Sequence, residues 1–257
     1  MNDVFDHRRY LIPCRATLLP QIFTDVLVVG AGVAGLRAAL AAAEHPGTAG
    51  GGNSCDVIVT AKADFQQSNT YWAQGGIATV LASEDTFASH IEDTLKAGAG
   101  LCDESVVKTV VEGGPARIHE LIQWGMRFDR AHGHSTAAKG STPAFSEGEI
   151  SFGREGGHSL HRILHSDGDA TGRELAITLD RTVRSRPNIR QFYNCFVLDL
   201  ITLDTNGHGG GRCVGAITHH PKHGLQVIWA NAVILASGGV GQVSISFLLF
   251  IYLCVPV

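Results

Sequence analysis

Residues 25–35 read Asp25-Val26-Leu27-Val28-Val29-Gly30-Ala31-Gly32-Val33-Ala34-Gly35. The first five form a short, mostly apolar run, typical of a strand that is buried on both faces of a parallel sheet. The glycines follow at the spacing G-x-G-x-x-G, and the alanine-rich stretch 36–44 has apolar residues at helical spacing. Between a strand and a helix this spacing predicts a dinucleotide-binding turn, because glycines let a pyrophosphate approach the backbone and the helix N-terminus attracts its charge.

A second predicted strand, Asp56-Val57-Ile58-Val59-Thr60, completes one βαβ unit. In NAD-binding units of this kind an Asp or Glu at the end of the second strand binds a ribose hydroxyl. Here the chain continues with Ala61-Lys62. The sequence therefore favours another dinucleotide over NAD.

The rest of the chain predicts helices over 89–97, 105–124 and 171–183, and strands over 189–193, 196–203, 213–218, 225–229 and 232–236. The segments that join the second, third and fourth of these strands carry hairpin-turn residues, which predicts a three-stranded β-meander. A meander argues against a simple nicotinamide enzyme, whose strands are joined by helices, and favours an FAD-dependent one. The predicted fold class is α/β, with an FAD-binding Rossmann-like parallel sheet and a β-meander.

Composition excludes several classes of protein. The chain has 257 residues, of which 44% are hydrophobic and 17% are charged, so it is long and apolar enough to form one large or two modest globular domains. Its formal charge is -4, and no run of Lys or Arg forms the basic stripe that nucleic acids require. We expect no nucleic-acid partner.

The cysteines and the two ends of the chain predict a location. The 6 cysteines are scattered without a C-x-x-C pair, which indicates reduced thiols. Residues 1–23 lack the features of a secretory signal. The apolar stretch 247–257 is about half as long as the roughly 20 residues that a membrane-spanning helix needs. We expect a cytoplasmic protein with no membrane segment.

Six further motifs decide the family. They are Asn69-Thr70-Tyr71-Trp72-Ala73-Gln74-Gly75-Gly76-Ile77-Ala78, His90-Ile91-Glu92-Asp93-Thr94, Gly98-Ala99-Gly100-Leu101-Cys102-Asp103, Arg154-Glu155-Gly156-Gly157-His158-Ser159, Arg162-Ile163-Leu164-His165 and Asp169-Ala170-Thr171-Gly172-Arg173. In this order they closely resemble the L-aspartate oxidase family, flavoenzymes of the succinate dehydrogenase and fumarate reductase superfamily. The resemblance runs from about Asp25 to Gly241.

The resemblance implies a function and its residues. The family oxidises L-aspartate to iminoaspartate by hydride transfer to FAD, with oxygen or fumarate as acceptor, in the first step of de novo NAD biosynthesis. Glu155 matches the carboxylate near the substrate ammonium, and His158 is expected to order the substrate pocket. The family also suggests a handover of the product to quinolinate synthase. The residues expected to bind FAD are Gly30, Ala31, Gly32, Val33, Ala34 and Gly35 at the pyrophosphate, Lys62 on the adenosine side, and Asn69, Thr70, Tyr71, Trp72, Ala73, Gln74, Gly75 and Gly76 around the flavin.

Two of these features have alternative interpretations that stay open. His158, His161 and His165 have a spacing that would place three imidazoles on one face of a helix, as in a metal site. We favour hydrogen bonding in the pocket instead and predict no metal. Glu155 has the alternative of an ordinary surface carboxylate, since an isolated Glu usually is one.

Two rival functions remain. One is the flavoprotein subunit of succinate dehydrogenase or fumarate reductase, which carries a histidine linked to FAD where this chain has Asn69, and no carboxylate where it has Glu155. Asn69 therefore predicts non-covalent FAD. The other rival is a non-catalytic remnant, because residues 244–257 match nothing in the family. We expect an irregular extension over 1–23, an incomplete FAD-binding domain over 24–243 that is truncated before the capping domain, and an aberrant apolar tail over 244–257. On this interpretation the chain by itself is inactive.

Overall fold

The computed structural model describes residues 18–47, 54–131, 150–203 and 211–239. The expected tail over 244–257 lies outside these ranges. The chain divides into two compact units, one formed by Met1–Phe65 with Val183–Val257 and the other by Gln66–Thr182. Each unit is described by itself below.

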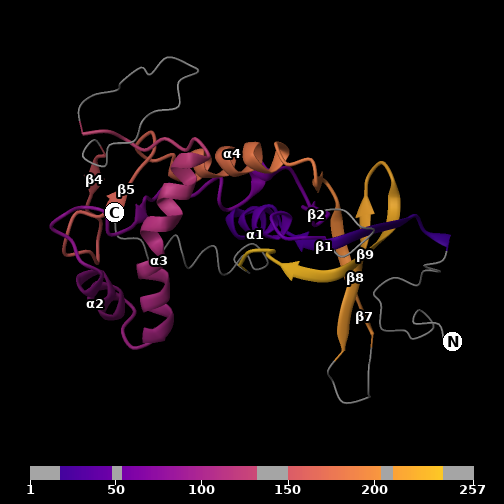
Figure 1. The fold of residues 1–257 in the computed structure, drawn as a ribbon, viewed down its shortest axis with the longest axis horizontal. Helices are drawn as coiled ribbons and strands as arrows, with labels where there is room; N and C mark the ends of the chain where they lie inside the picture. Colours follow the sequence, from indigo (N-terminus) through magenta and orange to yellow (C-terminus); the bar gives the residue numbers. More distant parts are fainter. Residues whose placement is uncertain (1–17, 48–53, 132–149, 204–210, 240–257) are drawn as a thin grey trace, which may run out of the picture. The chain divides into compact units, whose positions relative to one another are not determined.

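Six strands form one sheet in the first unit, in the order β6-β2-β1-β9-β8-β7 (Figure 1). The strands β6, β2, β1 and β9 pair in parallel, whereas β9, β8 and β7 pair antiparallel. The predicted parallel sheet and β-meander are both confirmed. The bounds are β1 Gln21–Val29, β2 Val57–Thr60, β6 Ile189–Phe192, β7 Phe196–Leu203, β8 Arg212–His220 and β9 Gly224–Leu235.

The sequence divides the last strand wrongly. The two strands expected over 225–229 and 232–236 are one strand, β9, because it pairs with β1 from Gln21↔Val227 to Val29↔Leu235 and thereby bridges both stretches. The pairing skips Asp25, and there the Asn231 side-chain amide donates to Asp25 Oδ1 at 3.2 Å. The strand β1 itself begins at Gln21, within the stretch expected to be irregular.

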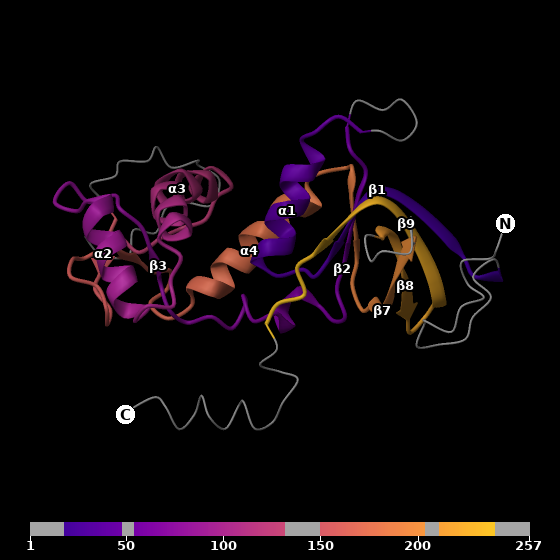
Figure 2. The same cartoon turned by 90° about the horizontal axis from the view of Figure 1, so that it is seen from below.

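The helix α1, Val33–Ala43, packs on β1 and β2, as Figure 2 shows. Its buried side chains include Leu36, Ala39 and Leu40, which recur at three and four residues and so line one face. The sheet supplies Leu27 and Ile58, both fully buried, to the core of this unit. This packing holds the turn between β1 and α1 at the carboxyl edge of the parallel strands.

The second unit is mostly helical. It contains α2, Phe87–Ala97, and α3, Glu104–Gln123, which pack against each other, and a small sheet in the order β3-β5-β4. Each of its strands has two residues, too few for an alternating pattern, so the sequence did not predict them. Ile118, Ile150 and Leu164 form its core. The remaining bounds are η2 Phe65–Gln67, β3 Ile77–Ala78, β4 Phe152–Gly153, β5 Ile163–Leu164 and α4 Thr171–Arg184.

None of the described helices combines the length and the apolar character needed to cross a bilayer. The described cysteines Cys55, Cys102, Cys195 and Cys213 are free thiols. Burial raises the pKa of Cys55 and of Cys195, so both thiols stay protonated and unreactive at neutral pH.

Candidate functional site

The turn at Gly30 admits no side chain. Gly30 has φ +119°, and a Cβ there would collide with the carbonyl of Ala236 at the end of β9. A Cβ at Gly35 would collide with the carbonyl of Gly30, so the third glycine lets α1 begin directly under the turn. Gly30 N donates to Thr60 O at 2.8 Å, which ties the turn to β2. The turn therefore lies where the carboxyl ends of β1, β2 and β9 meet, the edge at which open α/β sheets bind ligands.

The N-terminus of α1 is built differently from those of α2 and α3. Its N-cap, Gly32, makes no side-chain hydrogen bond, and its first turn carries no acidic residue. By contrast, Thr86 caps α2 and Asp103 caps α3 with side-chain oxygens. A helix start with neither a side-chain cap nor a carboxylate suits an external anion, because the dipole and the backbone N–H groups attract negative charge. The cradle that Gly30, Gly32 and Gly35 form with this helix start fits the pyrophosphate of FAD.

Lys62 is exposed just beyond the carboxyl end of β2. The residue before it, Ala61, is fixed by two backbone hydrogen bonds, from its N to Phe192 O at 3.0 Å and to its O from Cys195 N at 2.9 Å. Lys62 thus stands at the same sheet edge as the glycine turn, on the side of β2. This is where dinucleotide-binding folds recognise the adenosine ribose.

The segment 69–76 lies in the second unit and is exposed but anchored. Gly172 N, in the first turn of α4, donates to Ala73 O at 2.9 Å, and a Cβ at Gly172 would collide with the Thr70 carbonyl. Gln74 reaches Asp169 Oδ2 at 3.3 Å. Trp72 leaves 72% of its surface exposed. A fixed backbone with exposed side chains is what a segment that wraps a flat ring system requires.

Glu155 lies beside this segment. Its Oε1 is 2.9 Å from His165 Nε2 and accepts a long hydrogen bond from Gly76 N at 3.5 Å. The hydrogen bond from His165 is the largest cause that lowers the pKa of Glu155, with a smaller contribution from Gly76 N. Glu155 is therefore ionised at neutral pH. The structure brings together Glu155 and Gly76, two residues that the sequence assigned to one site.

His158 also meets Glu155, because its backbone N donates to Glu155 O at 3.3 Å, and after the larger contribution of His165 its charge helps to lower the pKa of Glu155. The His158 ring lies 5.6 Å from that of the buried His90, and burial is the largest cause that lowers the pKa of His90. His161 is exposed, and His165 pairs with Glu155. The segment that carries the three histidines is not helical, so they do not line one helix face, and the described residues contain no group of three metal-ligating side chains.

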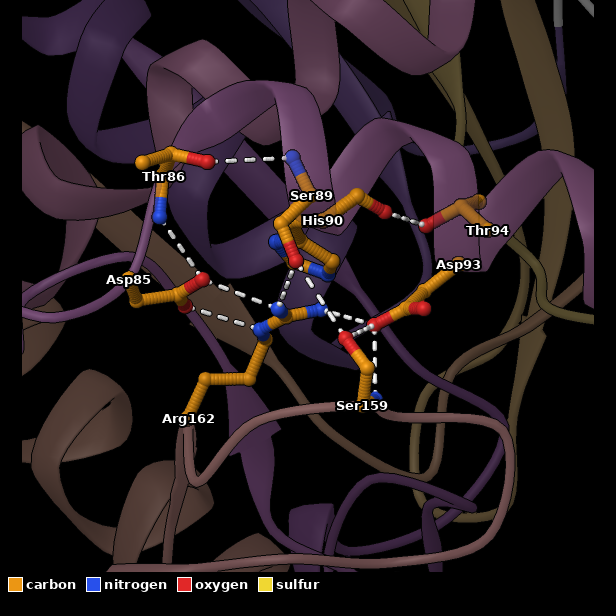
Figure 3. Close-up of polar contacts among 8 residues, drawn as sticks. All are labelled: Asp85, Thr86, Ser89, His90, Asp93, Thr94, Ser159 and Arg162. Carbon is orange, nitrogen blue, oxygen red and sulfur yellow. Dashed lines mark hydrogen bonds and ion pairs between the residues drawn. The ribbon is translucent and has the colours of Figure 1, made fainter.

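A buried ion network fixes the segment that carries Glu155 (Figure 3). Arg162 is fully buried, donates from Nε and Nη2 to Asp85, each at 2.8 Å, and from Nη1 to Asp93 Oδ2 at 2.6 Å. The same oxygen of Asp93 accepts from Ser159 N at 2.8 Å and Ser159 Oγ at 2.7 Å. These bonds, with Ser159 N as the largest cause, lower the pKa of Asp93 to about 2. The sequence motifs contained Asp93, Ser159 and Arg162, but nothing in their spacing showed that they meet.

A family model described as the FAD binding domain matches residues 25–253. The chain belongs to the FAD binding domain family. FAD is accordingly the cofactor, and the fold expected for such a flavoprotein is confirmed.

Relatives of this FAD-binding chain confirm the resemblance drawn from the motifs. It is 40% identical over 222 residues to the L-aspartate oxidase of Streptomyces coelicolor, covering 86% of this chain and 34% of that protein. It is also 40% identical to the L-aspartate oxidase of Pseudomonas aeruginosa, covering 85% of this chain and 38% of that protein. The chain therefore spans about a third of the length of the curated relatives that it matches.

Two solved structures share this fold. A quinol fumarate reductase of E. coli superposes with a TM-score of 0.71 at 31% identity, covering 88% of this chain and 34% of that one. A Mycobacterium smegmatis Sdh1 complex gives a TM-score of 0.72 at 29% identity, covering 87% of this chain and 36% of that one. The FAD-binding chain thus shares its fold with these subunits, while its identity to the L-aspartate oxidases is higher.

Proposed function

We propose that this chain provides the FAD-binding part of an enzyme that oxidises L-aspartate to iminoaspartate. The observation that carries the proposal is the ionised carboxylate of Glu155, which lies against Gly76 of the segment expected to wrap the flavin. The identity of 40% to L-aspartate oxidases supports it. Bound FAD supplies the acceptor to which the substrate gives a hydride, with oxygen or fumarate as the final acceptor.

In this proposal each part of the chain has one task. The glycine turn and the α1 N-terminus bind the FAD pyrophosphate through backbone N–H groups, and Lys62 faces the adenosine side. The segment 69–76 surrounds the flavin. Glu155 binds the substrate ammonium, since a carboxylate forms a charge-assisted hydrogen bond with a cationic amine. His158 orders the pocket from beside His90.

The second candidate, a flavoprotein subunit that oxidises succinate, is less favoured. Succinate has no ammonium group, so Glu155 would have no partner on it. A respiratory subunit would also link FAD to a histidine, and this chain has Asn69 there. We therefore propose that FAD is bound without a covalent bond.

We also propose a location and a partner for the protein. The four free thiols Cys55, Cys102, Cys195 and Cys213 support a cytoplasmic location. A handover of iminoaspartate to quinolinate synthase follows from the place of L-aspartate oxidases in NAD biosynthesis.

The function is tested by completing the chain. Residues 1–239 are joined to the following part of the Streptomyces coelicolor relative, loaded with FAD and assayed for L-aspartate-dependent peroxide formation beside the 257-residue chain. We expect the completed protein to turn over L-aspartate and the shorter chain to reach less than about a tenth of that rate, because a closed, water-poor site needs more chain than this third of the family's length. A completed protein that binds FAD but ignores L-aspartate would refute the function.

A further inference from the structure

Only one oxygen of the Glu155 carboxylate is held. Oε1 accepts hydrogen bonds from both His165 Nε2 and Gly76 N. No group of the described residues donates a hydrogen bond to Oε2. The side chain of Glu155 is 49% exposed, so without these contacts it would sample several rotamers. The hydrogen bond at 2.9 Å is the stronger of the two and therefore restricts the carboxylate most.

The imidazole of His165 is itself fixed, by two glycines. A Cβ at Gly153 in β4 would lie 2.9 Å from His165 Cε1, and a Cβ at Gly76 would lie 2.9 Å from its Nε2. At Gly153 the ring is the nearest obstacle to a side chain, whereas at Gly76 Ile163 Cγ2 and Leu164 O lie closer still. The backbone of His165 is held as well, because its carbonyl accepts from Asp129 N at 2.9 Å.

We propose that His165 is a positioning residue that orients Glu155 toward the ammonium group of an amino-acid substrate. With its proton on Nε2, His165 donates to Oε1 and leaves Oε2 for the ligand. The inference rests on the proposed function, because it assumes that Glu155 binds an ammonium. It goes further by assigning the choice between an aminodicarboxylate and a plain dicarboxylate to a pair of residues rather than to Glu155 alone.

Two variants separate positioning from a structural role. His165→Gln places an amide N–H where Nε2 stands, whereas His165→Asn carries the same group one methylene shorter and withdraws it from Oε1. The exposed His161 gives the matched control, His161→Asn. The variants are made in the completed, FAD-loaded protein described above. Each is assayed for the KM of L-aspartate and for competitive inhibition by succinate, which has no ammonium.

We expect His165→Asn to raise the KM of L-aspartate about tenfold, the scale of a lost hydrogen bond to a charged group. Inhibition by succinate should stay within about twofold on the same reasoning, since succinate makes no use of that bond. His165→Gln and His161→Asn should both behave like the wild type. In a Glu155→Gln background His165→Asn should have little further effect, because the group that it positions is gone.

Equal losses for L-aspartate and succinate, or no rescue by His165→Gln, would overturn the proposal. If His165→Asn fails to fold, His165→Gln tests the proposal by itself. This variant must keep the wild-type preference for L-aspartate over succinate. Imidazole ¹⁵N spectra of the 257-residue chain give a readout that does not depend on turnover. They should show the Nε2-protonated tautomer of His165, with a signal that shifts in Glu155→Leu while that of His161 does not. If the wild type shows this signal but the completed, FAD-loaded protein does not oxidise L-aspartate, the proposed function is refuted and not the contact of His165 with Glu155.

Discussion

Arg162 donates two parallel hydrogen bonds of 2.8 Å to the two oxygens of Asp85, and neither side chain has any exposed surface. This fork geometry satisfies both carboxylate oxygens and neutralises a charge that the interior could not otherwise hold. The third contact of Arg162, to Asp93, extends the pair to α2 and to Ser159 (Figure 3). The loop that carries Glu155 is thus fixed by charges that lie entirely inside the second unit.

Removing the guanidinium should destabilise this unit severely. Arg162→Met leaves Asp85 buried without its partner, which costs roughly 3–5 kcal/mol of unfolding free energy. The exposed pair of Arg117 with Glu120 gives the control, since Arg117→Met should cost about 1 kcal/mol or less. Urea unfolding followed by circular dichroism measures both. Similar losses in the two variants would contradict the buried network.

Asp93 should make the fold sensitive to acid. The pKa of Asp93 in the folded state is about 2, below its ordinary value of 3.8, so Asp93 contributes stability above pH 3.8 that is lost as the pH falls through about 2. Asp93→Asn should therefore flatten the loss of stability between these two pH values. The neighbouring exposed Glu92→Gln serves as the control. An unchanged pH dependence in Asp93→Asn would show that Asp93 titrates as in the unfolded chain.

Gly30→Ala should abolish FAD binding. The new methyl group would meet the Ala236 carbonyl at a φ that alanine rarely adopts, so the turn must open. Gly113→Ala, within α3 and with no atom within 4 Å of the added carbon, should leave FAD binding intact. Isothermal titration of the two variants with FAD compares them. Retained affinity in Gly30→Ala would mean that the cofactor does not use this turn.

FAD should leave the protein on denaturation. Asn69 offers an amide where the respiratory relatives carry the linking histidine, and an amide nitrogen is no nucleophile for the flavin. Acid precipitation should release all of the yellow colour into the supernatant. Flavin fluorescence that stays with the precipitated polypeptide would show a covalent link.

The sequence predicted the parts of the fold that repeat a local pattern. The β1 turn and α1 follow from the valine-rich run and the glycine spacing, and the meander follows from its hairpin turns. The small sheet β3-β5-β4 was not predicted, because each of its strands has only two residues and so shows no periodicity. The division of β9 was wrong because a strand's end depends on its neighbour, here β1, and not on its own residues alone.

The candidate site was predictable residue by residue but not as pairs. Glu155 and Gly76 came from the family resemblance, whereas the contact of Glu155 with His165, ten residues along, has no signal in the spacing. The spacing of His158, His161 and His165 had left a helical metal face as the less favoured alternative, and the segment is not helical. Asp85 was missed altogether, since a buried carboxylate is recognisable only by its partner.

We propose that Glu155 makes this flavoprotein select an amino acid over a plain dicarboxylate. Anaerobic bleaching of the flavin absorbance tests it most directly in the completed, FAD-loaded protein, with L-aspartate or succinate added to the wild type and to Glu155→Gln. We predict that L-aspartate bleaches the flavin of the wild type and that succinate does not. Glu155→Gln should lower the affinity for L-aspartate by about 10- to 150-fold, the free energy of one charge-assisted contact. Bleaching by succinate at the rate of L-aspartate, or an unchanged response in Glu155→Gln, would contradict the account.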